Sequence, residues 1–284
     1  MVTTIGSPAA QRAAESAAHD ADRSPRAALI TQVLDSLRFR GWFVCVSELS
    51  APWALQLPGG RLAAIHAVLE GDCVVTLASD GTTLHLSAGD VVVLPRDEVH
   101  AISDRAGRPA VAVTAIAGID RRDRRASSLT YGGGGVLTRL LTGSFTAEMR
   151  LAQAIVGGLP AIMVLRAATA ACARLSPALA LVREEAAQPA GVSPAVLRRA
   201  AEILFIQALR EALLDTRPAT GWLAAASDAR LAPALLALHE QPERRWTPLE
   251  LAHCAHLSRT AFLERFQACL GQSPNEFRAA AKRD

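Results

Sequence analysis

The length, composition and charge of the chain exclude several classes of protein. It has 284 residues, of which 50% are hydrophobic and 20% are charged. This length is ample for buried cores in one or two domains, and such a composition excludes a wholly disordered chain. The formal net charge of +3 is mildly basic, which is compatible with nucleic-acid binding without establishing it. No uncharged run of 18 apolar residues occurs, so we expect no transmembrane helix and no membrane partner.

The first 26 residues carry neither a targeting signal nor a structural pattern. They contain no apolar stretch of the kind found in secretory signals, so we expect a cytoplasmic protein. Their lack of apolar periodicity predicts a disordered lead-in over residues 1–26.

The cysteines predict reduced thiols. All five are scattered along the chain, and no two have Cys-x-x-Cys spacing. Redox sensing by Cys45 or Cys73 is a hypothesis worth testing, although burial in the core is the commoner role of such residues.

The first half of the chain changes from a helical to a β-type pattern. Apolar spacing predicts a helix over residues 27–39. Short β-type runs bounded by Gly, Pro, Asp or Ser then follow at residues 42–46, 62–69, 73–77, 82–86, 91–94 and 110–116. Many short strands at close spacing predict an antiparallel sandwich or barrel. We expect this domain to span residues 27–135 and to end in a flexible glycine loop at residues 132–135.

Helical spacing takes over after Gly135. Ser193 and Pro194 predict the start of a long helix whose apolar stripe continues to Leu214, with Glu211 among its exposed charges. We assign residues 136–220 to a helical connector that also serves dimerisation.

The last module, residues 221–284, has the pattern of a helix-turn-helix. The run Thr247-Pro248-Leu249-Glu250 is a capping box with proline in the first turn, and it predicts the first helix. Ser258 caps the second helix, which Gly271 ends. In such a motif the second helix enters the major groove of DNA.

This module resembles the AraC/XylS family of transcription regulators. The matching residues are Trp246, Thr247, Leu251, Ala252, Ala255, Leu257, Ser258, Arg259, Phe262, Arg265, Phe266 and the run 271–277. The resemblance implies DNA contacts from one side of the second helix, and our candidates for these contacts are Ser258, Arg259, Thr260, Leu263 and Gln267.

Two arginines of the second helix receive different interpretations. We expect Arg259 to bind a guanine or a phosphate, because its guanidinium can form two parallel hydrogen bonds. The alternative is an ion pair on the protein surface. For Arg265 we favour that alternative, with Glu250 or Glu264 as the partner.

The DNA-binding unit of the family has two helix-turn-helix motifs joined by a long helix. Residues 277–283 resemble the start of the joining helix, and the sequence then ends without the second motif. One motif makes fewer phosphate contacts than two. We therefore expect a single chain to bind DNA weakly and a homodimer to present two motifs.

The N-terminal domain resembles the cupin-type ligand-binding domain of the same regulators. The resemblance rests on residues 52–55, 65–71 and 86–95 and on His100. The second cupin motif keeps its spacing, but Asp97 and Asp104 stand where the motif has glycine and asparagine. Only His66 remains near the first motif.

The resemblance implies a ligand site inside the barrel. Our candidates for ligand contacts are His66, His100 and Trp53. The two histidines are also the candidates for a metal site, which Glu70 or Asp72 would have to complete. Because a lone inward histidine is more often a hydrogen-bonded core or ligand-contact residue, we expect no metal and no other cofactor.

Together these patterns predict an α+β protein of several domains. An N-terminal antiparallel cupin barrel is followed by a helical connector and a C-terminal all-α helix-turn-helix domain. The predicted function is that of a non-enzymatic, sequence-specific transcription regulator whose partners are double-stranded DNA and a small-molecule effector or redox signal. The alternatives are a metal-dependent cupin enzyme, which the depleted first motif disfavours, and a ligand-binding cupin that no longer binds DNA.

Overall fold

The computed structural model describes residues 25–36, 39–60, 63–96, 98–116, 127–147, 159–188, 193–215, 221–241 and 243–281. The chain forms two compact units. The barrel unit is residues 37–215, and the helical unit combines residues up to 36 with residues 216–284. No helix of the described residues is long and apolar enough to cross a membrane. Most of the predicted lead-in lies outside the described residues, and Pro25 and Arg26 already belong to a helix.

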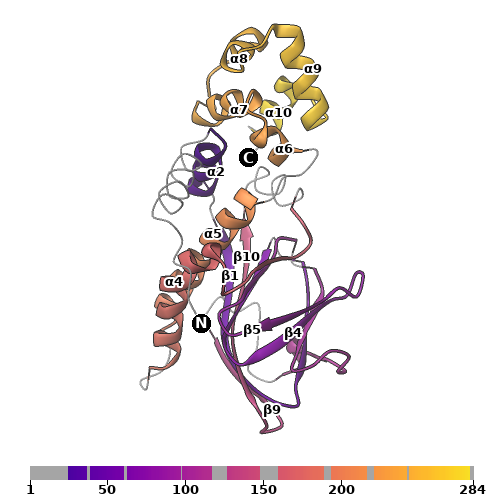
Figure 1. Cartoon of the computed structure of the whole chain (residues 1–284), viewed down its shortest axis with the longest axis vertical. Coiled ribbons are helices and arrows are strands. Elements are labelled where there is room, and N and C mark those ends of the chain that lie inside the picture. The colour runs from indigo at the N-terminus through magenta and orange to yellow at the C-terminus, as the bar shows by residue number, and fades with distance from the viewer. Residues whose placement is uncertain are drawn as a thin grey trace, which may run out of the picture. The chain divides into compact units, whose positions relative to one another are not determined.

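Two β-sheets form the core of the barrel unit (Figure 1). The six-stranded sheet has the order β11 (Met163–Leu165), β6 (Val91–Leu94), β3 (Ala63–Glu70), β10 (Leu137–Ala147), β1 (Phe39–Ser50) and β9 (Ser127–Gly132). The five-stranded sheet has the order β5 (Thr83–Ser87), β4 (Asp72–Leu77), β7 (His100–Ser103), β2 (Ala54–Leu57) and β8 (Val111–Ala112). Most neighbouring strands are antiparallel, whereas β1–β9 and β2–β8 are parallel pairs. The predicted β domain followed by helices is confirmed.

Side-chain alternation along the strands decides which residues enter the barrel. On β3, Ala64 and Val68 belong to the core cluster between the sheets, and His66 lies between them on the same face. On β7, Ile102 belongs to that cluster, so His100, two residues earlier, shares its face. Both histidines therefore face the interior, and each is only 1% exposed.

Two helices of the barrel unit, α4 (Ala170–Ala186) and α5 (Pro194–Asp215), pack against each other and contact the six-stranded sheet. The rings of Phe145 on β10 and Phe205 on α5 lie 4.5 Å apart between their centroids. Glu211 of α5, which the sequence analysis assigned to an exposed face, is 6% exposed. Its carboxylate accepts two hydrogen bonds from the guanidinium of Arg174 on α4, and this ion pair is what allows the charge to be buried.

The six-stranded sheet extends into the region predicted to be helical. The predicted boundary at residue 135 falls between β9 and β10, two strands of one sheet. On β10 the inward-facing residues include the polar Thr138 and Thr142. The sequence of this strand therefore lacks the alternation of apolar and polar residues by which a strand is predicted. The predicted strand at 110–116 is also shorter, because β8 is followed by a 3₁₀ turn, η1 (Val113–Ala115).

The glycine run between β9 and β10 packs closely against the end of β1 instead of forming an open loop. Gly132 has φ +128°, and a Cβ there would lie 1.9 Å from the carbonyl oxygen of Ser50. The N–H groups of Gly133 and Gly135 donate to the carbonyls of Ser50 and Ala51, at 2.8 and 2.7 Å. The close approach explains why glycine is required at this turn.

The helical unit contains α2 (Pro25–Ser36), α6 (Trp222–Ser227), α7 (Leu231–Glu240), α8 (Pro248–Cys254), α9 (Arg259–Leu270) and α10 (Pro274–Ala281). Helix α2, which the sequence analysis grouped with the barrel, packs against α6 and α7. Its Leu29 and Ile30 are each 1% exposed, and Gln32 donates to Glu240 of α7 at 2.9 Å. The helical unit is therefore assembled from two separate stretches of the chain.

The predicted caps of the helix-turn-helix are confirmed. The Thr247 side chain accepts a hydrogen bond from the Glu250 N–H, and the Glu250 carboxylate accepts one from the Thr247 N–H. Ser258 caps α9 by accepting from the Ala261 N–H. Gly271 ends α9 in the left-handed conformation, with φ 69°.

Candidate functional site

The two faces of α9 differ completely in exposure. Phe262 and Phe266 are fully buried, with ring centroids 5.5 Å apart. The residues predicted to contact DNA lie on the remaining surface of the helix and at its start. Of these, Ser258, Arg259, Thr260 and Gln267 are exposed and Leu263 is half-buried.

Arg259 is the charged group of this face. Residues 259, 263 and 267 are four apart, so they line one side of the helix. Arg259 lies in the first turn of α9, and its guanidinium has no hydrogen bond or ion pair with any residue that the structure describes. An exposed guanidinium beside the polar side chains of Ser258 and Thr260 can bind a phosphate or a base edge.

Arg265 forms an ion pair at the protein surface, as predicted, but the predicted partners are wrong. Its Nε donates to Oδ2 of Asp228 at 2.6 Å, and neither Glu250 nor Glu264 is involved. Asp228 precedes α7, and its Oδ1 accepts from the N–H groups of Arg230 and Leu231. Partial burial acts to raise the pKa of Asp228, but the hydrogen bonds from Arg265 and these backbone groups hold it below its ordinary value. The pair connects α9 to the start of α7.

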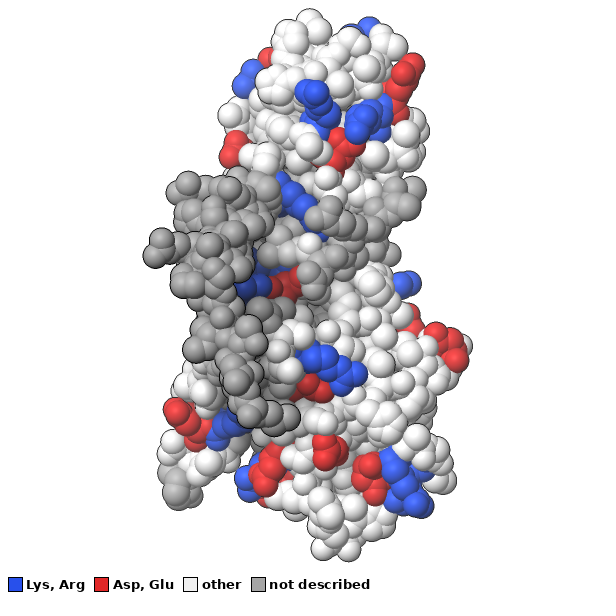
Figure 2. All heavy atoms as spheres, viewed as in Figure 1, with Lys and Arg blue, Asp and Glu red and all other residues white. Residues whose placement is uncertain are grey.

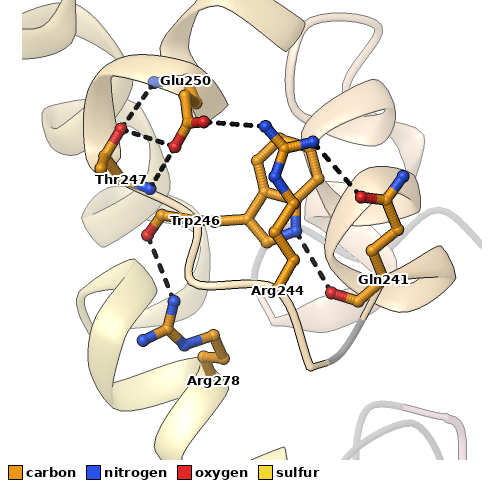
Figure 3. Close-up of polar contacts among 6 residues, drawn as sticks. All are labelled: Gln241, Arg244, Trp246, Thr247, Glu250 and Arg278. Atoms are coloured by element: carbon orange, nitrogen blue, oxygen red, sulfur yellow. Dashed lines mark hydrogen bonds and ion pairs between the residues drawn. The ribbon is translucent and has the colours of Figure 1, made fainter.

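A second cluster fixes the start of α8 (Figure 3). The Arg244 guanidinium lies 3.9 Å from the centroid of the Trp246 ring and donates to Glu250 at 2.8 Å. The Trp246 indole N–H donates to the carbonyl of Gln241, and Arg278 of α10 donates to the carbonyl of Trp246. The helix-turn-helix is thereby attached to both neighbouring helices.

Glu250 is the acidic group of this cluster. Hydrogen bonds from the Thr247 backbone and side chain and from Arg244 lower the pKa of its carboxyl to about 2. The capping box therefore holds a charged carboxylate at the N-terminus of α8, where the helix dipole also favours it.

Charges of both signs occur together on one face of the molecule. On the face drawn in Figure 2, blue and red side chains lie close to one another across most of the described area. This fits a chain with 30 basic and 27 acidic residues. The described residues on this face therefore show no large field of a single sign.

The interior of the barrel holds a hydrogen-bonded chain that joins the two sheets. The Nε2 atoms of His66 and His100 are 2.9 Å apart. The Nδ1 atom of His66 lies 3.1 Å from Oγ1 of Thr142, and Nδ1 of His100 lies 2.6 Å from the carbonyl oxygen of Glu98. Sequence analysis found the two histidines but missed Thr142, because β10 was not recognised as a strand.

Next to these hydrogen-bonded side chains is a small, mainly apolar cavity. Eight hydrocarbon side chains line it together with Cys45, Ser47 and Thr142. The cavity has a volume of about 20 Å³. This is enough for one water molecule and too little for a larger ligand without side-chain movement.

Trp53 is the third predicted ligand contact. It packs in the same core cluster, is 1% exposed, and its indole N–H has no hydrogen-bond partner among the described residues. A buried donor without an acceptor is unusual in a native core.

The residues around the histidine pair do not fit a metal centre. In the described part of the chain, no group of three or more His, Cys, Asp or Glu side chains is placed to hold a metal ion. Glu70 pairs with Arg139 at 3.0 Å, and the Asp72 side chain is on the exposed side of β4. Of the two substituted motif positions, Asp104 pairs with Arg108, and Asp97 lies outside the described residues.

Two thiols of the barrel unit, Cys73 and Cys172, have raised pKa values. Burial, followed by the charges of Asp72 and Asp90, raises the pKa of Cys73 to about 12. Burial also raises the pKa of Cys172. A thiol with a raised pKa is a poorer nucleophile, which argues against redox sensing by Cys73.

Comparison with known proteins now defines the class. The family described as Cupin matches residues 28–213, which is well over half of the chain, and the chain belongs to that family. An AraC-like transcription regulator, as it is named, from Streptomyces antibioticus is 27% identical over 250 residues, covering 87% of this chain and 80% of the relative. The HTH-type transcriptional regulator AlkR from Acinetobacter baylyi is 23% identical over 252 residues, covering 86% and 80%.

Solved structures give weaker matches. ToxT from Vibrio cholerae has a TM-score of 0.31 and 7% identity, covering 85% of this chain and 98% of that one. The AraC-like activator CuxR has a TM-score of 0.29 and 12% identity, covering 78% and 65%. The family and sequence matches confirm the resemblance to AraC-type transcription regulators with a cupin domain.

Proposed function

We propose that this protein is a transcription regulator that binds specific DNA sequences with the outer face of α9. The observation that carries the proposal is the exposed side of α9, where Arg259 has no partner in the described structure and its neighbours are Ser258 and Thr260. The caps and the Asp228–Arg265 pair support it, because they hold α9 rigidly within the unit. A rigid second helix is the element that reads the major groove in this motif.

DNA binding is tested by fluorescence anisotropy with duplexes from upstream of the gene itself and of its neighbours. The full-length protein is titrated at two salt concentrations against an unrelated duplex. Specific binding that weakens with salt is expected. Arg259→Ala should lower the affinity by roughly 5- to 100-fold, the range for loss of a well-placed arginine contact.

The matched control is Arg105→Ala. Arg105 is an exposed arginine of the barrel unit, so this variant removes the same charge away from α9. Equal losses from the two variants would mean that only net charge matters. Binding to all duplexes alike would contradict the proposal.

We propose further that the barrel senses a small molecule. The cavity supports a ligand there. The unpartnered indole N–H of Trp53 is a separate buried donor of the barrel core, because Trp53 is not among the residues that line the cavity. The ring nitrogens of both histidines already bond to protein groups, which favours binding over catalysis. An effector that prefers one arrangement of the barrel would shift the population of the DNA-binding form.

The regulator is proposed to work as a cytoplasmic homodimer. The described residues contain one helix-turn-helix, and two copies would contact two successive major grooves. Large apolar side chains exposed on α4 and α5, namely Leu181, Val196 and Ile203, support a contact between chains. Analytical ultracentrifugation with and without operator DNA tests the dimer, and a monomer under both conditions would contradict it.

A further inference from the structure

Glu264 lies on the side of α9 that points away from the core. The helix turns by about 100° per residue, and the buried rings of Phe262 and Phe266 mark the side that faces the core. Glu264 is two residues from each ring, which places it on the opposite side of the helix. It is exposed, as are Thr260 and Gln267, its neighbours one turn before and after it. Glu264 therefore belongs to the middle of the face that we propose binds DNA.

The Glu264 carboxylate has no partner in the part of the chain that the structure describes. On a helix, side chains three and four positions apart can pair, and none of the four residues at those distances from Glu264 is charged. The adjacent Arg265 donates to Asp228 instead. The outer face of α9 thus carries an acid whose charge no cation of the helix neutralises.

A carboxylate at this place weakens DNA binding unless it bonds to a base. Phosphates are negative, so the carboxylate opposes the electrostatic attraction that supplies general affinity for DNA. Its two oxygens only accept hydrogen bonds, so it needs a donor from the partner. In the major groove the donors on the base edges are the amino groups at N6 of adenine and N4 of cytosine.

Of these two bases, cytosine fits a carboxylate better. The edge of adenine presents N7, an acceptor, beside its N6 amino group, and N7 repels a carboxylate oxygen that approaches the amino group. The edge of cytosine presents the N4 amino group without an acceptor next to it. Guanine and thymine present only acceptors, which exclude the carboxylate.

We infer that Glu264 is a specificity-determining residue, which recognises a C·G base pair by accepting a hydrogen bond from the N4 amino group of cytosine. The inference rests on the proposed binding of DNA by α9 and adds a residue that the sequence analysis considered only as a partner of Arg265. Glu264 contributes discrimination between bases rather than affinity, because its charge is unfavourable beside every other base edge.

In vitro selection from a library of random duplexes tests the inference without a known operator. The full-length protein should enrich duplexes with cytosine at one position, preferred by roughly 10-fold or more, the effect of one hydrogen bond to a charged group. In Glu264→Ala this preference should be lost while the preferences at other positions stay. In Glu264→Gln it should move toward adenine, whose N6 and N7 atoms match an amide.

A modified base tests the contact in the wild-type protein. N4-methylcytosine still pairs with guanine, but a methyl group replaces the N4 hydrogen that faces the major groove. At the selected position it should weaken wild-type binding by roughly 10-fold in fluorescence anisotropy, and it should leave binding by Glu264→Ala unchanged. The same modification at a cytosine of the flanking DNA is the control and should change neither affinity.

The matched control variant is Glu184→Ala. Glu184 is an exposed acid of α4 in the barrel unit, so this change removes the same charge away from α9. It should retain every base preference of the wild type. Binding to an unrelated duplex should become tighter in Glu264→Ala and not in Glu184→Ala, because only Glu264 faces the phosphates.

Failure of this inference can be told apart from failure of the proposed function. If the wild-type protein enriches no sequence, sequence-specific binding by α9 is rejected together with the role of Glu264. If it enriches a site that Arg259→Ala binds more weakly, but Glu264→Ala keeps every base preference, only the role of Glu264 is rejected. Wild-type binding that tolerates N4-methylcytosine at each cytosine of the site would reject that role as well.

Discussion

Polar side chains in the barrel interior and on the outer face of α9 differ in burial and in hydrogen bonding. Inside the barrel, His66, His100 and Thr142 are nearly inaccessible, and each bonds to another protein group. On α9, Arg259 is exposed and has no partner among the described residues. Buried polar groups must be bonded within the fold, whereas water satisfies an exposed guanidinium until a ligand replaces it. The two candidate sites are therefore recognised by different signs: buried polar side chains bonded to one another beside a cavity in one, and exposed polar side chains along a helix in the other.

The largest expected effect separates the two faces of α9. Phe262→Ala should lower the free energy of unfolding by about 3–5 kcal/mol, because a buried ring is replaced by a cavity. Arg259→Ala should change it by less than about 0.5 kcal/mol, since the side chain is exposed. Chemical denaturation of the full-length protein measures both. Equal destabilisation by the two variants would mean that Arg259 is a structural residue.

A smaller effect tests the partnership inside the barrel. His66→Leu leaves the Nε2 atom of His100 and the hydroxyl of Thr142 without their partner, at a cost of roughly 1–3 kcal/mol of unfolding free energy. The double variant with His100→Leu should cost less than the sum of the single variants, because the second change removes a group already left unpaired. A double-mutant cycle from urea titrations measures this coupling. If the losses of the two single variants simply add, His66 and His100 are not energetically coupled.

The smallest effect concerns the exposed capping box of α8. The folded-state pKa of Glu250, about 2, lies below the ordinary value of 4.5. The stability that its carboxylate contributes is therefore fully present above pH 4.5 and is lost as the pH falls toward 2. Unfolding measured across this range should show a weaker acid dependence in Glu250→Gln. An unchanged pH profile in that variant would mean that Glu250 does not contribute to the pH dependence of stability.

Local signals predicted the helix-turn-helix well. The capping box at Thr247, the cap at Ser258 and the left-handed Gly271 each depend on residues within one turn, so the sequence contains the whole signal. Short strands such as Val91–Leu94 were equally readable from their β-branched runs.

Features that depend on distant residues were missed. The partner of Arg265 is 37 residues away at Asp228, in a turn that carries no sequence signal for the pairing. Strand β10 was not predicted, because its inward-facing threonines are polar. Their burial is tolerated through hydrogen bonds to His66 of β3 and to the carbonyl of Asp72. The grouping of α2 with α7 brings together residues 208 positions apart, such as the hydrogen-bonded Gln32 and Glu240.

The two-part origin of the helical unit has a practical consequence for protein engineering. Residues 37–215 form a cassette inserted between α2 and α6. A chimera that exchanges sensors should therefore keep residues 25–36 together with residues 221–281. A fusion that begins at α6 and omits α2 would discard Leu29 and Ile30 and leave a hydrophobic gap where they pack.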